Sequence, residues 1–524
     1  MKLINFVKSM GKAELRLTIL LIVLCVAVIS YLGCSGSDPS PDEPQVLARV
    51  EVPGYLEDLT LPVYADIEDA EEIYYALVIA TKTQLDKAGV TYRVIDVYTP
   101  GTRYLIALEE DEGARQEAAG LVNVLYDDGE HIIVRYTFAL SELLSEIGFD
   151  VSLMNNYPIW SGTAKSSSIA KSKLSAAADS FVKNTKVEAM LNAVTQGDIE
   201  LYTEYLSGEK QVTVKGKQVS LDFRHTYKKD TKVAEATQYI LDQLTTMGVT
   251  ANFSEWTYIY KDEDDPDSTP ITVKGRNVIG EIEGQTSPKE IVILIAHLDS
   301  ISGKTDITAP GADDNASGCV GLLTAAKIMS SMTKDLPPKR VYKFKRTVRF
   351  VFTTGEEQAI IGGNAYAKTV YDKGENIVAV LNLDMIGYSK INDPPVKPMQ
   401  QIKIRNDQFR TAYEKDLPIA QTYINVVNNY GMNQVFDVKL TPDGEPFSDH
   451  APFWSVCTAK EKDSVCYPAA WAIEYAEKGF INPKMHSEND RIKLNDVYHM
   501  NMPYYRAIVK AALGTMAHLA ETVD

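Results

Sequence analysis

The side chains of this sequence that could do chemistry are imidazoles and carboxylates gathered in five short segments of its second half. These segments are AHLDS, PGADDNASG, TTGEEQ, NLDMIG and KMHSEND. Their candidate residues are His297, Asp299, Asp313, Asp314, Glu356, Glu357, Asp384 and His486. Imidazole and carboxylate together suit zinc, whereas a purely oxygen set suits calcium or magnesium. The two His residues and three of the carboxylates would be enough to hold two metal ions that share one carboxylate.

Each segment taken alone also has an ordinary structural interpretation. A His after an apolar strand is more often a hydrogen-bonded core residue than a ligand. Asp314 could cap the helix that follows it, and the Glu356–Glu357 pair could complement a helix dipole. If there were no metal site, separate structural reasons would be needed for the acids and imidazoles of all five segments in a single domain, which is a poor explanation of the pattern. We therefore favour a shared metal site.

Apolar strands precede most of these segments. Ile291–Ala296, Thr347–Thr353 and Ile377–Leu383 are continuous apolar runs, typical of parallel strands buried on both faces. Helical periodicity falls between them, at Ser317–Met332 and Ala359–Tyr371. In open α/β sheets, ligands bind beyond the carboxyl ends of the strands, so we expect the polar clusters to converge there.

The chain is predicted to contain two folded parts. Residues 181–524 predict an α/β domain, with a mixed, mainly parallel sheet sandwiched by helices. Residues 48–160 contain a diverged repeat, in which the stretch from Ala76 resembles the one from Ile132. Each copy reads as a strand, a short helix closed by Gly and another strand, which predicts an N-terminal α+β accessory domain. Residues 161–180, rich in Ser, Ala and Lys, are predicted to be a linker.

The first 33 residues are interpreted as an export signal or a signal anchor. Lys and Arg residues precede an apolar run over 17–32, which is shorter than the ~20 residues of a comfortable membrane span. Gly33 and Cys34 resemble the lipobox of bacterial lipoproteins, so Cys34 is a candidate for lipidation and membrane attachment. Residues 34–47 are then a tether.

An export signal predicts a cell-envelope location, as a periplasmic or outer-membrane lipoprotein. A signal-anchored or secreted protein is the alternative. In an oxidising compartment Cys457 and Cys466 could form a local disulfide, whereas Cys319 lies in an apolar helical pattern and is interpreted as a buried small residue. The net charge of −18 argues against a nucleic-acid partner. Oligomeric state is left open.

The five segments, together with SDHAPF, resemble the co-catalytic zinc aminopeptidase family in their order and spacing. Relatives in that family include bacterial leucine-preferring aminopeptidases, glutamate carboxypeptidases and glutaminyl cyclases. The resemblance runs from about Phe181 to the C-terminus and does not reach the accessory domain. It implies a zinc-exopeptidase fold, two zinc ions and an exported metallopeptidase acting on the N-termini of peptide substrates.

The resemblance also implies a role for individual residues. His297 and Asp384 would hold one zinc ion, Glu357 and His486 the other, and Asp314 would bridge them, with a cis peptide bond after it. Two further residues are implied to be catalytic: Glu356 would be the general base, and Asp299 would orient the ring of His297. The candidates for contact with the substrate are Ser448, Asp449, His450 and Tyr388. Alternatives are a carboxypeptidase, a dipeptidase or a glutaminyl cyclase of the same fold, or a non-catalytic binding module. The complete ligand set with its base favours two-metal hydrolysis.

Overall fold

The computed structural model describes residues 43–523, apart from positions 53, 70 and 72 and the segments 111–112, 155–157, 161–180, 261–269, 304–306, 334–342, 391–396, 457–465 and 477–479. The export signal, Cys34, most of the tether, the linker and Cys457 therefore lie outside the described residues. Their interpretations stay predictions, as do the domain boundaries. Gln45–Asp524 form one compact unit. Within the described part of the chain, none of the helices is long and apolar enough to cross a membrane.

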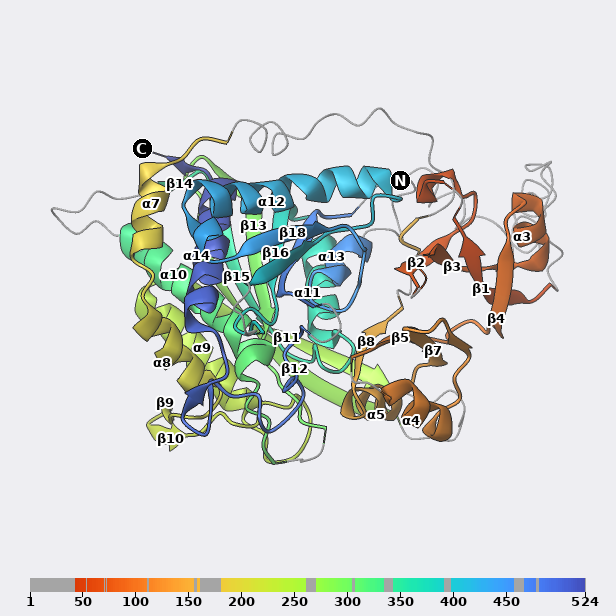
Figure 1. The fold of residues 1–524 in the computed structure, drawn as a ribbon, viewed down its shortest axis with the longest axis horizontal. Coiled ribbons are helices and arrows are strands. Elements are labelled where there is room, and N and C mark those ends of the chain that lie inside the picture. The colour runs from red at the N-terminus through yellow and green to blue at the C-terminus, as the bar shows by residue number, and fades with distance from the viewer. Residues whose placement is uncertain are drawn as a thin grey trace, which may run out of the picture. The chain divides into compact units, whose positions relative to one another are not determined.

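The N-terminal region, residues 45–160, contains two small antiparallel sheets (Figure 1). The first has the strand order β2-β3-β1-β4 and the second β6-β7-β5-β8, so both place their strands in the same sequence. Elements of the first are β1 (Gln45–Glu51), η1 (Leu56–Asp58), β2 (Val63–Glu68), β3 (Tyr74–Thr81), α3 (Lys82–Ala88) and β4 (Tyr92–Val97). Elements of the second are β5 (Tyr104–Glu109), α4 (Ala114–Leu121), β6 (Tyr126–Asp127), β7 (His131–Arg135), α5 (Phe138–Glu146) and β8 (Phe149–Leu153).

The two stretches that resemble each other in sequence are β3-α3-β4 and β7-α5-β8. A glycine in the left-handed backbone region ends the helical turn of each, Gly89 at φ 67° and Gly148 at φ 101°. Such backbone angles strain residues that carry a Cβ atom. The glycines therefore let the chain leave the helix and enter the next strand.

An eight-stranded mixed sheet dominates the remainder of the chain, in the order β11-β12-β15-β13-β16-β19-β17-β18. Its central strands β15, β13, β16 and β19 are parallel to one another. The strands are β11 (Thr250–Tyr260), β12 (Ile271–Ile282), β13 (Ser287–His297), β15 (Arg346–Thr353), β16 (Asn376–Leu383), β17 (Met399–Lys403), β18 (Asp437–Thr441) and β19 (Ala469–Glu474). The three predicted apolar strands are confirmed as β13, β15 and β16.

Helices cover both faces of this sheet, as Figure 1 shows for α10 and α14 on one side and α11 and α13 on the other. The helices are α7 (Thr185–Asn192), α8 (Gln196–Leu206), α9 (Val233–Met247), α10 (Gly318–Thr333), α11 (Ile361–Asp372), α12 (Arg410–Asn429), α13 (Ala451–Ser455) and α14 (Met502–Leu519). Alternate residues of β13 face the two layers, with Val292 and Leu294 in one apolar cluster and Ile293 and Ile295 in another. The predicted fold class is confirmed.

Short elements complete the described structure. They are β9 (Val212–Val214), β10 (Lys217–Val219), η2 (Ala312–Ser317), β14 (Lys343–Phe344), η3 (Met432–Gln434), β20 (Lys493–Leu494), β21 (Val497–Tyr498) and β22 (Thr522–Val523). One of them matters for the site. The segment η2 leads directly into α10 and carries Asp313 and Asp314.

Apolar side chains of the N-terminal region pack against the large sheet. Leu105 and Val134 share a cluster with Trp256 of β11, and Tyr104 shares another with Trp471 of β19. Burying apolar area of this kind contributes roughly 25 cal/mol for each Å² removed from water. The second small sheet is therefore held firmly beside the carboxyl ends of the large sheet's strands.

Candidate active site

The polar segments converge because the strands that precede them end at the same edge of the sheet. His297, the last residue of β13, pairs in register with Thr353, the last residue of β15. Asp384 directly follows β16, another neighbour of β13. The pair Asp313–Asp314 does not directly follow a strand. It lies in η2, where the start of α10 brings it back over the strand ends.

The centre of the cluster is the carboxylate of Asp314, which lies between two imidazoles. Its Oδ1 is 3.2 Å from Nε2 of His297, and its Oδ2 is 3.1 Å from Nε2 of His486. Nε2 of His297 is also 3.2 Å from Oδ1 of Asp384. Nε2 of His486 is 3.1 Å from Oε2 of Glu357. The structure thus brings together all five residues predicted as ligands, in the two pairs that the family resemblance implies.

These spacings fit a metal centre. Ligand atoms of His297, Asp314 and Glu357 all lie within 4.8 Å of one another. Two ligands that each bind zinc at 2.0–2.1 Å in a tetrahedron are about 3.3 Å apart, close to the 3.1–3.2 Å separations found here. Oε1 of Glu357 is buried without a hydrogen-bond partner among the described residues, which leaves it free to bind a cation. The types and spacing of these residues therefore fit the binding of a metal ion such as zinc.

Burial dominates the electrostatics of the cluster. It raises the pKa of Glu357 to about 7 and the pKa of Glu356 well above its usual range. Burial also acts to raise the pKa of Asp314, but the imidazoles of His297 and His486 outweigh it, so that this pKa is lowered. Ionised carboxylates packed this closely repel one another, and a divalent cation between them would remove that repulsion.

Asp299 supports the site in a different way from the one predicted. The ring Nδ1 of His297 lies 3.2 Å from the main-chain oxygen of Asp299 and 3.8 Å from its carboxylate. The main-chain oxygen therefore fixes the tautomer of the ring. The carboxylate instead accepts hydrogen bonds from the hydroxyl of Thr226, at 3.1 Å, and from the main-chain N–H of Glu356, at 3.3 Å. It positions the segment that carries Glu356 and Glu357.

The four predicted substrate-side residues are not on the cavity surface. Ser448 donates to Oδ2 of Asp384 at 2.5 Å, and Asp449 accepts a hydrogen bond from Thr353 at the end of β15. His450 is buried and stacks on Trp471, with ring centroids 5.1 Å apart. Tyr388 packs on His499, with ring centroids 4.9 Å apart. Ser448 and Asp449 thus hold Asp384 and the end of β15, and His450 packs against Trp471, which lines the cavity.

Asp490 is a structural residue that sequence reasoning missed. Its buried carboxylate accepts hydrogen bonds from the main-chain N–H groups of Asp313 and Asp314, at 3.0 and 2.9 Å. Asp313 points away from the imidazoles and accepts from Gly387 at 2.7 Å and from Asn482 at 3.1 Å. Asp490 ends the KMHSEND segment, so its place in that motif was the available signal. The peptide bond between Asp314 and Asn315 is cis, as predicted.

The cysteines fit the sequence predictions where the structure describes them. Cys466 is disulfide-bonded, and its predicted partner Cys457 lies outside the described residues. Cys319 is a buried free thiol, as expected, and donates a hydrogen bond to the main-chain oxygen of His297 at 3.0 Å. It packs behind the ligand and does not face the cavity.

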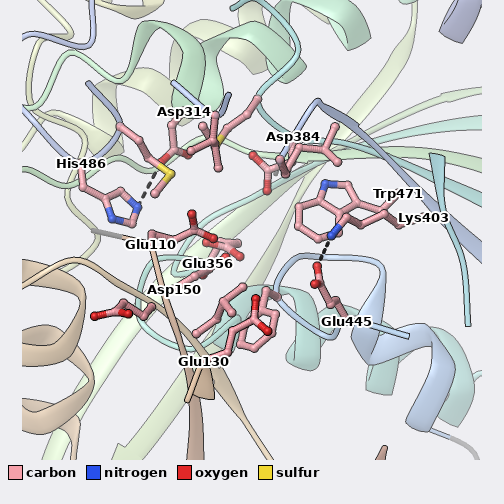
Figure 2. Close-up of a pocket in the computed structure, with 18 of the residues that line it drawn as sticks. Glu110, Glu130, Asp150, Asp314, Glu356, Asp384, Lys403, Glu445, Trp471 and His486 are labelled. Atoms are coloured by element: carbon pink, nitrogen blue, oxygen red, sulfur yellow. Dashed lines mark hydrogen bonds and ion pairs between the residues drawn. The ribbon is translucent and has the colours of Figure 1, made fainter. Parts of the chain in front are cut away.

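A cavity of about 290 Å³ opens directly beside the cluster. Asp314, Glu356 and Asp384 face it from segments beside the ends of the large sheet's strands, together with the apolar side chains of Met385 and Trp471. Figure 2 shows residues of the N-terminal region on the opposite side, with Glu130 and Asp150 below the cavity in this view and Asp314 and Asp384 above it. The described cavity is thus bounded by both parts of the chain.

Comparison with known proteins finds a family match for the part of the chain that carries this cluster. Residues 277–522 match the model of peptidase family M28. The chain carries a peptidase family M28 domain. The match contains all five candidate ligands and Glu356, and it agrees with the family resemblance of the sequence motifs.

Fungal proteins are among the relatives that this chain matches. Over 237 residues it is 29% identical to a probable leucine aminopeptidase of Arthroderma otae, covering 41% of this chain and 57% of that protein. Over 227 residues it is 30% identical to leucine aminopeptidase 1 of Trichophyton rubrum, covering 43% and 54%. The chain therefore spans about half the length of the curated relatives it matches.

A solved structure shares the fold. The crystal structure of the Legionella pneumophila LapA aminopeptidase matches with a TM-score of 0.52 and 17% sequence identity. The match covers 80% of this chain and 99% of that one. At this identity the likeness shows a common fold.

Proposed function

We propose that this protein is a zinc aminopeptidase that hydrolyses the first peptide bond of peptides with a free N-terminus. The observation that carries the proposal is the position of Asp314 between His297 and His486, beside a cavity that Glu356 faces. A carboxylate flanked by two imidazoles offers ligand types that bind zinc and can be shared by two ions. The M28 match and the names of the fungal relatives support the same activity.

The chain's own residues suggest how the zinc ions would be held. His297 and Asp384 would hold one ion, Glu357 and His486 would hold the other, and Asp314 would be shared between them. Zinc bound there would supply Lewis acidity for activating water and polarising a peptide carbonyl. Ser448 would keep Asp384 in place through its hydroxyl, which donates to Oδ2 at 2.5 Å.

Glu356 is the proposed general base. Its side chain is 9% exposed, faces the cavity and has no hydrogen-bond partner among the described residues. Its nearest described ionic neighbour is Nε2 of His297, at 4.0 Å from Oε2. A carboxylate in this position can take a proton from the attacking water and return it to the departing amine. Because burial raises its pKa, Glu356 holds a transferred proton more readily than an exposed carboxylate does.

The charges around the cavity favour a substrate's amino end over its carboxyl end. A carboxypeptidase needs a free cation to bind the terminal carboxylate. Among the described residues that line the cavity, Lys403 is the one Lys or Arg. Its ammonium group is already paired with Asp443, at 3.0 Å, and with Glu445. The free carboxylates of the cavity instead suit an ammonium group.

A panel of tripeptides tests this proposal. We expect Leu-Gly-Gly and its C-terminal amide to be cleaved at similar rates, and N-acetyl-Leu-Gly-Gly to resist cleavage, with about two zinc ions bound to each chain. Chromatography of the products and elemental analysis of the protein give the readouts. Cleavage that requires a free C-terminus would instead identify a carboxypeptidase. Cyclisation of N-terminal Gln peptides would identify a cyclase, and metal binding without turnover a binding module.

Asp299→Asn tests the support of the base. We expect kcat/KM for Leu-Gly-Gly to fall about 10–100-fold, because an amide offers one acceptor oxygen to the two donors Thr226 and Glu356. Steady-state kinetics measure the loss. The matched control Thr226→Val removes one of these donors and leaves the carboxylate intact, so its loss should be smaller. An Asp299→Asn protein with the kcat/KM of the wild type would contradict the positioning role.

A further inference from the structure

One wall of the cavity comes from outside the M28 domain. The carboxyl end of β5, the turn between β6 and β7, and the start of β8 contribute Glu110, Glu130 and Asp150 to the cavity lining. The residues matched to the family begin only at 277. The family's own motifs therefore do not account for this wall, which Figure 2 shows opposite Asp314 and Asp384.

Two carboxylates of the wall are uncompensated. Those of Glu130 and Asp150 have no hydrogen-bond or ion-pair partner within the part of the chain that the structure describes. Other acids close to the cavity differ, since Glu109 pairs with Arg115 at 3.2 Å and Glu445 pairs with Lys403. Unpaired carboxylates that face a partly closed cavity attract a cation more strongly than they would at an open surface.

The wall is fixed to the segments that precede and begin the large sheet by polar as well as apolar contacts. At the end of α5, Glu146 pairs with Lys228 at 3.0 Å, and the phenol of Tyr258 accepts a hydrogen bond from Arg103 at 2.6 Å. These contacts lie beside the apolar cluster that Leu105 shares with Trp256. Domains joined by a large apolar interface move little against each other. The wall therefore shapes the cavity permanently and does not act as a detachable cover.

We propose that the N-terminal region makes this enzyme selective for short peptides that carry a Lys or Arg side chain in addition to the free N-terminus. The inference rests on the proposed aminopeptidase function and names its substrate class. A cavity of about 290 Å³ lies near the lower end of the roughly 300–1,000 Å³ typical of ligand sites. It leaves little room for a long chain, while Glu130 and Asp150 provide the counter-charge for a basic side chain.

The test compares matched substrates. Norleucine has the carbon chain of Lys without its ammonium group, so Lys-Ala and Ala-Lys are each compared with the norleucine analogue. For the wild type we expect kcat/KM to favour at least one Lys peptide by about tenfold or more. In the double variant Glu130→Gln and Asp150→Asn, that preference should fall about tenfold, because two neutral amides replace the two charges. The thermal unfolding midpoint verifies that each variant is folded.

A matched control and a length series complete the experiment. Glu117→Gln removes a carboxylate from the exposed face of α4, away from the cavity, and should keep the Lys preference of the wild type. Peptides of two to ten residues should be cleaved less efficiently as they lengthen. Equal kcat/KM for Lys and norleucine peptides, or for short and long peptides, would overturn the inference while leaving the aminopeptidase intact.

The absence of any peptide turnover would be a failure of the proposed function instead. In that event, calorimetric binding of Lys-Ala and its norleucine analogue to the wild type and to the double variant still decides the role of the wall. Tighter binding of Lys-Ala by the wild type alone would support selectivity. Equal binding by both proteins would overturn it.

Discussion

Replacing Glu356 by Gln should lower kcat by about 10²–10⁴-fold while leaving the fold and the bound metal in place. The amide has the shape of the carboxylate but cannot accept a proton from water at neutral pH. Because no described side chain donates a hydrogen bond to the Glu356 carboxylate, the substitution leaves no partner unsatisfied. The hydrogen bond from the main-chain N–H of residue 356 to Asp299 also remains. The loss should therefore lie in the chemical step.

The measurement separates this role from that of a ligand. Elemental analysis of the Glu356→Gln protein should give the metal content of the wild type, whereas Glu357→Gln should lower it, since Glu357 lies 3.1 Å from Nε2 of His486. Substrate KM should change little for Glu356→Gln. If this variant kept the wild-type kcat, Glu356 would not be the base, and another acid of the cavity would have to be sought.

Arg224→Met should cause the largest loss of stability of any single change considered. Arg224 is 0% exposed, and its guanidinium donates to main-chain oxygens of four separate segments. Its partners are the carbonyl oxygens of Leu298 at 2.7 Å, Pro310 at 2.7 Å, Gly311 at 3.0 Å, Leu221 at 3.2 Å and Leu206. Methionine fills similar space without donors, so these carbonyls lose their partners. We expect about 3–5 kcal/mol of lost stability.

Urea unfolding measures this effect, with Arg276→Met as a matched control. Arg276 also donates to a main-chain oxygen, that of Ala234 at 2.8 Å, but it is partly exposed and water can replace its hydrogen bonds. Its loss should be about 1 kcal/mol or less. Since Arg224 joins the loop after β13 to the segment before η2, activity should fall too. Equal losses from the two substitutions would contradict this structural role.

The sequence predicted the central sheet and the metal cluster because both are encoded locally. Apolar runs such as Ile291–Ala296 identify buried strands, and the acids and imidazoles stand directly after them or in the following loops. Parallel strand ends then meet at one edge without any further information. Asp314 was the partial exception, since it reaches the cluster through the start of α10 and not through a strand end.

Other features depend on contacts between distant parts of the chain. Nothing in the local pattern around Asp150 distinguishes it from a surface acid, and only the docking of β8 brings it to the cavity. Arg224 likewise belongs to no motif. Ser448, Asp449 and His450 begin the recognisable segment SDHAPF, but the sequence does not show which way their side chains point. The fold turns them towards Asp384, Thr353 and Trp471.

The shared strand order of the two N-terminal sheets suggests an ancestral gene duplication, after which the copies diverged in charge. The residue before β7 is Glu130, whereas the residue before β3 is Ile73. The second residue of β8 is Asp150, whereas the second residue of β4 is Arg93. Only the copy beside the metal cluster carries acids at these positions. The acidic residues at these two positions therefore correlate with proximity to the cavity and not with the common origin of the two copies. This is expected if the acids arose after the second copy came to line the cavity.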